Sequence, residues 1–295
     1  MNKDHSVNIL IGAMEYYKIA VLITCHNRKE KTLVCLESLY NQKRDQNINL
    51  QIYLVDDGST DGTSDVIKEK YPEVIILFGS GNLFWGGGMR LVFAKAMEKG
   101  YDFYLWLNDD VILYQDAVTN LIKTYFLVKN KTNKDSLIVG ACKDPFSGKL
   151  SYSGKKNKSV FLPLSFKNIE PRKEPVICNT ISGNCVLIPD IIAKEVGNID
   201  KAFPQKLGDM DYGLRARKKG YITWLSPWYA GKCSANPATE SWADKRISLR
   251  ERVSLVPSLT RGKPIEGFKI FAKRYGGPFW FIFWLLPYRK IFLSF

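Results

Sequence analysis

Apolar runs rich in β-forming residues alternate with amphipathic segments through the first half of the chain. The apolar runs cover residues 19–24, 50–55, 74–78 and 103–107. Between them lie three proline-free segments with the lengths and charge patterns of surface helices, 30–42, 63–71 and 90–99. This alternation predicts βαβ units around a largely parallel sheet. We therefore expect an α/β fold.

Polar residues stand where each apolar run ends. They are Thr24, His26, Asn27 and Arg28 after the first run, VDDGSTDGT (55–63) at the second, GSGNLFWGGG (79–88) after the third, and Asn108, Asp109 and Asp110 after the fourth. In open α/β sheets, ligands bind beyond the carboxyl ends of the strands. We expect these four loops to meet at one crevice.

The composition limits the kind of partner and the compartment. Lys and Arg number 43 against 29 Asp and Glu, a formal charge of +14, which favours an anionic partner such as a nucleotide, nucleic acid or acidic membrane. The six cysteines form no CxxC pair, so neither a zinc site nor a disulfide framework is indicated and a reduced, cytosolic compartment fits best. Residues 1–17 lack the pattern of a secretory signal and are expected to be a loose extension.

Two adjacent acids, Asp109 and Asp110, end an apolar strand. Leaving them unpaired is costly because like charges repel and the neighbouring strand is apolar. Mg²⁺ or Mn²⁺ would relieve this cost, since such ions take carboxylate oxygens and keep positions open for water or phosphate. Alternatively, one acid caps the following turn or helix.

Two further motifs each have a binding and a structural interpretation. Asp56 and Asp57 end a strand, where a carboxylate accepts hydrogen bonds from a nucleotide base or ribose, or else shapes a turn. The glycines 86–88 follow Trp85; they allow backbone to approach a ligand closely or form a flexible turn before a helix. No GK[ST] follows them, so they are not a Walker A loop.

The segment GDMDYGLRARKKGY (208–221) has the acids and bases of a helix whose charges complement its dipole. The i, i+4 spacing predicts that Asp211 pairs with Arg215. Asp209 is then free to face a cleft as a general base. The chain contains neither GxSxG nor HExxH, which argues against a serine hydrolase or a zinc hydrolase.

The rest of the chain is less regular. Residues 144–175 are rich in Lys, Ser and Pro and predict a β-hairpin insertion or a mobile loop. The tail, 276–295, is dense in aromatic residues, but its apolar run is shorter than the roughly 20 residues that span a bilayer. With basic residues on both sides, the tail either lies on anionic lipid or packs on the protein or a second subunit.

Taken in order, these segments resemble the motifs of the inverting family 2 glycosyltransferases with the GT-A fold. The matching segments are IAVLITCHNRKEKT, IYLVDDGSTDGT, GNLFWGGGMR, YLWLNDDV, ISGNCVLIP and GDMDYGLRARKKGY, spread over roughly 18–225. The resemblance is greatest to members that transfer rhamnose or other hexoses onto bacterial cell-envelope polysaccharides. It implies a mostly parallel central sheet flanked by helices.

The expected organisation has three parts. Residues 1–17 form the N-terminal extension, 18–235 the GT-A catalytic domain, and 236–295 a C-terminal helical, aromatic-rich extension that contacts a membrane or a second subunit. Within the catalytic domain, 18–115 is the nucleotide-binding half and 116–235 the acceptor-binding half.

The resemblance also implies roles for single residues. Asp209 would be the catalytic base, and Asp110 with Asp109 would hold Mn²⁺ or Mg²⁺. The nucleotide and donor sugar would be bound by Thr24, His26, Asn27, Arg28, Asp56, Asp57, Asn82, Trp85, Gly86, Gly87 and Asp109. The acceptor would lie beside Gly183, Asn184 and Asp211.

Two positions depart from the family pattern. Gly208 stands where many relatives have a glutamate before the base. The stretch WYAGKCSANPAT (228–239) lacks the histidine that many relatives use as a further metal or phosphate ligand. We expect Lys232 to neutralise the diphosphate there, which would weaken the metal dependence.

The resemblance therefore predicts an enzyme for bacterial surface polysaccharide synthesis, cytoplasmic and at the inner face of the cell membrane. It would move a hexose, such as rhamnose, from a UDP- or dTDP-sugar to a glycan or lipid-linked glycan, with inversion, and could form a homodimer. A sugar-nucleotide nucleotidyltransferase is disfavoured because TCHNRKEKT lacks a glycine-rich triphosphate loop. A non-enzymatic module for lipid or nucleic acid is disfavoured because the basic residues are dispersed, and nucleic acid is not an expected partner.

Overall fold

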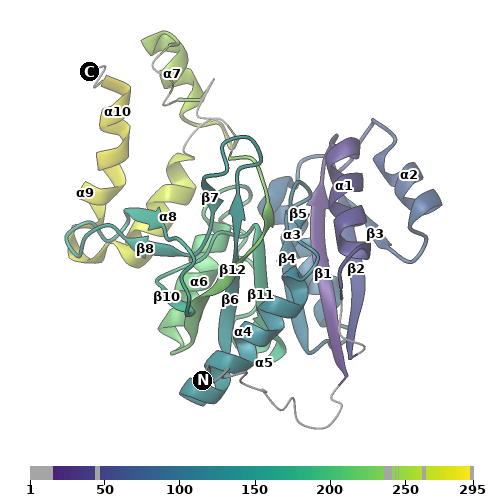
Figure 1. Ribbon diagram of the computed structural model, residues 1–295. Helices are drawn as coiled ribbons and strands as arrows, with labels where there is room; N and C mark the ends of the chain where they lie inside the picture. The colour runs from purple at the N-terminus through teal and green to yellow at the C-terminus, as the bar shows by residue number, and fades with distance from the viewer. Residues whose placement is uncertain are drawn as a thin grey trace.

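A computed structural model of the 295-residue chain describes residues 16–43, 47–235, 241–242, 244, 246–260 and 264–292 (Figure 1). The predicted N-terminal extension lies outside these residues except for Tyr16 and Tyr17. Tyr17 is already part of the sheet, because it pairs with Ile48.

The strands are β1 (Tyr17–Cys25), β2 (Ile48–Asp56), β3 (Ile75–Phe78), β4 (Phe103–Leu107), β5 (Ile112–Leu113), β6 (Ser136–Lys143), β7 (Leu150–Tyr152), β8 (Lys155–Asn157), β9 (Phe166–Asn168), β10 (Val176–Cys178), β11 (Cys185–Pro189) and β12 (Ile222–Lys232). The helices are α1 (Lys29–Tyr40), α2 (Thr63–Lys70), α3 (Phe84–Met97), α4 (Ala117–Thr132), α5 (Asp190–Val196), α6 (Gly208–Lys218), α7 (Leu249–Leu255), α8 (Ile265–Tyr275), α9 (Trp280–Leu285) and α10 (Arg289–Phe292). Two 3₁₀ turns, η1 (Gly277–Phe279) and η2 (Leu286–Tyr288), flank α9.

The central sheet has the strand order β10-β12-β6-β11-β4-β1-β2-β3. β1 pairs in parallel with β2 and β4, and β2 with β3, as the alternating pattern predicts. β11 joins the two halves by running antiparallel to β4 and β6, and β6 is parallel to β12. The predicted α/β class is confirmed.

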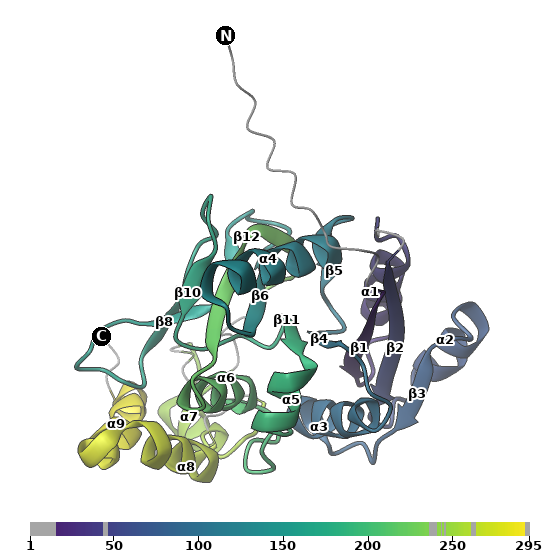
Figure 2. The same cartoon turned by 90° about the horizontal axis from the view of Figure 1, so that it is seen from below.

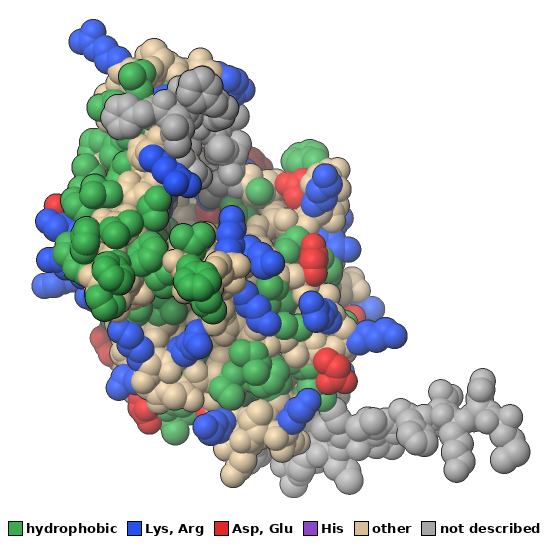
Figure 3. Space-filling model, turned by 90° about the vertical axis from the view of Figure 1, so that its left-hand side faces the viewer, with side chains coloured by type: hydrophobic (Ala, Val, Ile, Leu, Met, Phe, Trp, Pro, Cys, Tyr) green, Lys and Arg blue, Asp and Glu red, His purple; other side chains and the backbone are tan. Residues whose placement is uncertain are grey.

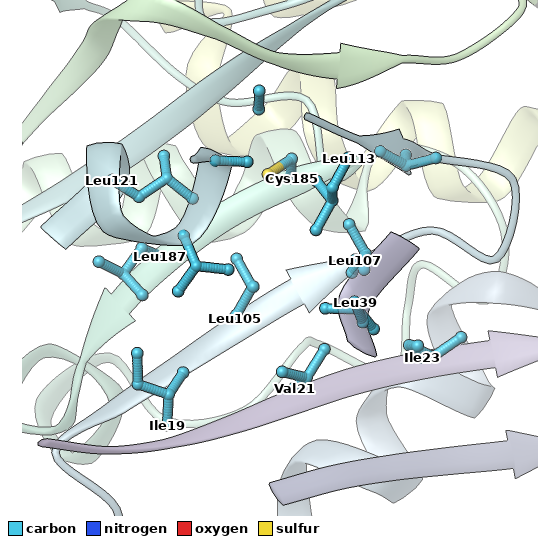
Figure 4. Close-up of a cluster of buried hydrophobic side chains, with 14 of the residues drawn as sticks. Ile19, Val21, Ile23, Leu39, Leu105, Leu107, Leu113, Leu121, Cys185 and Leu187 are labelled. Carbon is cyan, nitrogen blue, oxygen red and sulfur yellow. The ribbon is translucent and has the colours of Figure 1, made fainter. Parts of the chain in front are cut away.

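Two apolar cores cover the two faces of the sheet. On β1, Ile19, Val21 and Ile23 belong to one core and Ala20 and Leu22 to the other, because successive side chains of a strand point to opposite faces. The first core lies under α1 and α4 (Figure 4), and the second under α3, α5 and α6 (Figure 2). Burying a large aliphatic side chain contributes about 1.5–3 kcal/mol, so a strand buried on both faces is a rigid support for the loop at its end.

Helix α3 begins at Phe84, earlier than the predicted start near residue 90. The three glycines therefore lie inside the helix and are buried, although glycine has a low helix propensity. Tertiary contact explains this start: the Gly86 N–H donates to the Pro204 carbonyl over 2.6 Å. A Cβ on Gly86 would lie 2.2 Å from the Phe203 carbonyl oxygen.

The less regular segments are also ordered where described. β8 and β9 form an antiparallel hairpin, the first of the two alternatives for 144–175. The described part of the C-terminal extension is helical, and Phe268 and Phe271 of α8 form a third apolar cluster with Phe203. Among the described residues, no helix has the length and apolar character needed to cross a membrane.

Candidate functional site

A cleft of about 950 Å³ opens at the carboxyl ends of β1, β2 and β4. The predicted site residues that line it are Thr24, His26, Arg28, Asp57, Trp85, Asp109, Asp110, Gly183, Asn184 and Asp209. The predicted site residues that are not part of its lining are Asn27, Asp56, Asn82, Gly86, Gly87 and Asp211. The sheet topology thus brings together loops that are far apart in the sequence.

Asp109 and Asp110 both form ion pairs with the side chain of Arg28. The Arg28 guanidinium donates to Asp109 Oδ1 over 2.9 Å and to Asp110 Oδ2 over 2.5 Å. Asp109 is only 3% exposed, and its Oδ2 is buried without a hydrogen-bond partner among the described residues. Burial raises the pKa of Asp109 to about 7, and the Arg28 charge offsets part of that shift.

These carboxylates fit a divalent cation. With both acids ionised, the Arg28 cluster carries a net negative charge, which would repel a diphosphate. The unpartnered Asp109 Oδ2 is a hard oxygen donor of the type that Mg²⁺ and Mn²⁺ prefer. The described residues contain no group of three or more His, Cys, Asp or Glu placed to hold an ion. An ion here would depend on water and donor phosphate for its remaining ligands, a common arrangement for Mg²⁺.

Cys233, in the stretch that lacks the family's histidine, contacts Asp110 and was not predicted. Its thiol donates to Asp110 Oδ1 over 3.3 Å and accepts from Asn184 Nδ2 over 3.7 Å. Burial and the Asp110 charge raise the pKa of Cys233, so the thiol stays protonated. Lys232, the predicted diphosphate partner, is exposed and does not line the cleft, so the structure does not support that expectation. The sequence did contain a signal for this difference. Neighbouring residues of a strand face opposite sides, so Lys232 and Cys233 were not expected to reach the same site.

Asp56 and Asp57 are engaged in the loops around them. Asp57 accepts from the backbone N–H groups of Gly81, Leu83 and Phe84 over 2.8, 2.8 and 3.1 Å. Asp56 accepts from the Ser59 N–H over 2.8 Å and from the Ser64 hydroxyl. A carboxylate has about four lone-pair sites, so Asp57, which lines the cleft, keeps capacity for a ligand. Asp56 is buried away from it.

His26 and Asn27 hold two loops together. Asn27 has φ of 49°, and its side-chain oxygen accepts from the Thr60 N–H over 2.7 Å, which ties the β1–α1 loop to the β2–α2 loop. His26 Nδ1 donates to the Asp57 carbonyl over 2.6 Å. Asn27 therefore shapes the rim, while His26 also lines the cleft.

Trp85 is fixed on both sides. Its indole N–H donates to Asn108 over 2.8 Å and its backbone N–H to Gln205 over 2.7 Å. A Cβ on Gly183 would lie 2.6 Å from the Trp85 ring, so Gly183 makes room for that ring. Gly86 and Gly87 do not line the cleft; they let α3 approach Pro204, and a direct donor contact by them stays a prediction.

Asp209 lies in the first turn of α6 and faces the cleft. Its carboxylate accepts from the Gly183 N–H over 2.9 Å and from its neighbour's N–H, that of Met210, over 2.8 Å. Burial raises the pKa of Asp209, while these N–H donors and Lys155 lower it. A buried carboxylate whose pKa is raised is a stronger proton acceptor than an exposed one.

Asp211 does not contact the acceptor side, which corrects the expectation for this residue. It is fully buried and pairs with Arg215 over 2.8 Å, as the spacing predicts, and with Arg274 over 2.9 Å. The Tyr275 hydroxyl donates to it over 2.7 Å. Because Arg274 and Tyr275 belong to α8, Asp211 joins the C-terminal helices to α6.

The model of one protein family, described as glycosyl transferase family 2, matches residues 20–194, more than half of the chain. The chain belongs to glycosyl transferase family 2. The resemblance inferred from the motifs is therefore confirmed, and the matched region contains the Asp109–Asp110 pair and the Gly183 loop of this family 2 protein.

Two curated relatives are rhamnosyltransferases. An N-acetylglucosaminyl-diphospho-decaprenol L-rhamnosyltransferase of Mycobacterium tuberculosis is 24% identical over 200 residues, which is 60% of this chain and 64% of that protein. The dTDP-rhamnosyl transferase RfbG of Shigella flexneri is 34% identical over 104 residues, 33% of this chain and 34% of that protein. The chain thus spans less than two thirds of the length of these relatives.

Solved structures of glycosyltransferases share the fold. The S. aureus TarS fragment 1–349 has a TM-score of 0.54 at 12% identity, covering 87% of this chain and 70% of that one. GalNAc-T7, solved with UDP, GalNAc and Mn²⁺, has a TM-score of 0.57 at 14% identity, covering 72% of this chain and 42% of that one. At these identities the likeness shows the GT-A fold.

Proposed function

We propose that this family 2 protein is an inverting glycosyltransferase that moves a hexose, with rhamnose favoured, from a UDP- or dTDP-sugar to a hydroxyl of a glycan or lipid-linked glycan. The observation that carries the proposal is a single cleft holding two separate acidic centres, Asp109 with Asp110 and, apart from them, Asp209. The names of the two relatives support rhamnose, and the second names dTDP. The first also supports a lipid-linked acceptor in bacterial surface polysaccharide synthesis, which would place the enzyme at the cytoplasmic face of the membrane.

The chain's own residues divide the reaction between Asp209, which acts on the acceptor, and the residues that hold the donor. Asp209 takes the proton from the acceptor hydroxyl, whose oxygen then forms a bond to the anomeric carbon. The bond from that carbon to the diphosphate breaks in the same displacement, so the configuration inverts. Gly183 and Met210 orient the Asp209 carboxylate through their N–H groups.

On the donor side, Trp85 offers a fixed ring against which a sugar can pack. Asp109 and Asp110 would hold Mn²⁺ or Mg²⁺, which when bound stabilises negative charge on the leaving diphosphate as a Lewis acid. The metal-bound neighbour GalNAc-T7 supports this choice of ion. Arg28, which pairs with both acids when no donor is present, is close enough to contact the diphosphate once it leaves them.

Asp209→Asn tests the assignment of the base. The amide is nearly the same shape but cannot take up a proton, and it leaves Asp109, Asp110 and Trp85 unchanged, so transfer is expected to fall by about 10² to 10⁴ while donor binding is unchanged. Transfer is measured with radiolabelled sugar nucleotides, donor binding by thermal shift with UDP, dTDP and their sugars, and folding by circular dichroism. Near-wild-type turnover in Asp209→Asn would refute the role, and failure of all these nucleotides to bind the wild type would refute the transferase proposal.

A further inference from the structure

An apolar face outside the cleft is built from two separate parts of the chain. One part is the tip of the β8–β9 hairpin, residues 160–162, where Val160 is 87% and Phe161 82% exposed. The other is the outer side of η1 and α9, where Phe279 is 61% and Leu285 54% exposed. Monomeric soluble proteins seldom leave such groups of large apolar side chains in water.

The two parts lie side by side. Leu164 and Phe166 of the hairpin and Trp284 and Tyr288 near α9 pack on the same buried cluster around Phe203. The hairpin and α9 are neighbours in both ribbon views (Figures 1 and 2). Figure 3 looks onto this side and shows hydrophobic side chains gathered there. Residues distant in sequence therefore share one face.

The conformation of the exposed tip is fixed by hydrogen bonds within the turn. Lys158 donates to the Ser165 carbonyl over 2.8 Å, and Ser165 to the Leu162 carbonyl over 2.9 Å. The Asn157 side chain donates to the Pro163 carbonyl over 2.7 Å. These bonds use only polar groups to close the turn, and its apolar side chains at 160–162 stay exposed.

The rim of this face is basic. On the hairpin, segment 156–168 contains three lysines, all exposed, and no acid, and α8 adds Lys269 and Lys273. Lys273 and Lys269 sit over the rings of Trp280 and Trp284, 5.0 and 5.6 Å from the centroids. Figure 3 shows Lys and Arg side chains around the hydrophobic area.

We propose that the hairpin tip and the outer side of α9 together dock this protein on an anionic lipid surface. Aromatic and aliphatic side chains enter the interface while basic groups meet lipid phosphates. A second copy fits less well, because a two-fold contact would bring identical basic rims against each other.

The root of the β8–β9 hairpin lies near Asp209, at the other end of the hairpin from the exposed tip. Lys155, the first residue of β8, lowers the pKa of Asp209, so the root of the hairpin is close to the proposed base. A membrane docked on this face would present a lipid-linked hydroxyl toward Asp209. This consequence rests on the proposed function, whereas the lipid binding itself does not.

The test measures binding of the full chain to sedimented vesicles of phosphatidylethanolamine and phosphatidylglycerol, against vesicles of phosphatidylcholine. We expect preference for the anionic vesicles and weaker binding at high salt. Phe281 of α9 is 47% exposed on the same side. The double variant Phe161→Ser, Phe281→Ser should bind at least about tenfold more weakly than the wild type, because each serine removes apolar area from the interface. The triple variant Lys156→Gln, Lys158→Gln, Lys167→Gln should lose the preference for anionic lipid.

Phe146→Ser is the matched control, since Phe146 is 92% exposed but lies on the β6–β7 turn. It should bind vesicles like the wild type. Thermal shift with sugar nucleotides should be the same in all variants, which separates failure of this proposal from failure of the transferase proposal. Equal binding to neutral vesicles, no effect of the serine pair, or a dimer in light scattering that the serine pair abolishes would overturn the proposal.

Discussion

Arg28 pairs with Asp109 and Asp110 in the donor-free protein, and the proposed function gives it the diphosphate as a partner when donor is bound. Its guanidinium occupies the space between Asp109 and Asp110, which are the proposed cation ligands. The same charge is of use to a diphosphate only when Arg28 turns away from the acids. In the donor-free protein, Arg28 and a divalent ion therefore compete for the same carboxylates.

Arg28→Met should bind Mn²⁺ more tightly than the wild type when no donor is present, by about threefold or more, because the competing cation is gone. Free Mn²⁺ measured by electron paramagnetic resonance gives the affinity without catalysis. With Mn²⁺ saturating, the same variant should bind nucleotide diphosphates more weakly. Arg217→Met, an exposed arginine on α6, is the control. Unchanged or weaker Mn²⁺ binding in Arg28→Met would contradict the competition.

Asp109 lowers the stability of the folded protein when its carboxyl is ionised. Its pKa is raised to about 7 chiefly by burial, so the ionised form is disfavoured in the folded protein. That cost is present above pH 7 and disappears as pH falls and the folded state takes up a proton. Asp109→Asn should therefore raise the melting temperature by a few degrees at pH 8, and the gain should shrink toward pH 5. Differential scanning fluorimetry across this range checks it; a gain that grows toward low pH would mean that another group controls stability.

At the scale of elements, α3 shows tertiary packing overriding local preference. Three glycines weaken a helix, yet here they let its first turn reach the segment around Pro204. That contact places Trp85 in the cleft wall. The start of α3 is therefore decided by a segment more than a hundred residues away.

Gly86→Ala should reduce the free energy of unfolding by about 1–3 kcal/mol despite alanine's better helix propensity, because the new Cβ meets backbone that cannot move aside. Gly87→Ala is the matched control in the same turn. Its Cβ would meet the Leu83 side chain at 3.2 Å, which a small shift accommodates. Urea denaturation distinguishes the two; equal stability of both variants would mean that the approach to residues 203 and 204 is not tight.

At the scale of the whole molecule, a buried charge network joins the C-terminal helices to the catalytic fold. Asp211 holds Arg215 within α6 and Arg274 and Tyr275 from α8. Arg274 also pairs with Asp200 over 2.7 Å. The proposed lipid surface on α9 is thus connected to the helix that carries Asp209.

Asp211→Asn should cost about 3–5 kcal/mol of unfolding free energy, since Arg215 and Arg274 lose the buried carboxylate that they share, and Arg274 alone keeps a second one, Asp200. Limited proteolysis should cut near α8 faster than in the wild type. The exposed pair Lys95–Glu98, 2.7 Å apart, provides the control, and Glu98→Gln should leave the urea midpoint unchanged. Wild-type stability and proteolysis in Asp211→Asn would show that α8 is held by its apolar contacts alone.

The sequence was sufficient for the features that depend on local periodicity and on strand direction. Continuous apolar runs specify β1 to β4, because burial of a strand on both faces requires such a run. Amphipathic segments specify the helices between them, because a helix that packs on the sheet is buried on one face. Parallel strands then bring their carboxyl ends to one edge, so Asp110 and Asp57 could be assigned to one cleft before any coordinates, whereas Asp209 was assigned to it through the family resemblance. The Asp211–Arg215 pair also followed from spacing along one helix.

Only the tertiary structure decided which partner each side chain meets. Arg28 lies between Asp109 and Asp110, Cys233 instead of Lys232 reaches Asp110, and Asp211 turns inward to α8. Each of these contacts joins elements distant along the chain, and the residue types alone allow several partners with similar energies. The place of β12 in the sheet and the packing of α8 beside α6 select one of them, because burial leaves no room or solvent for the others.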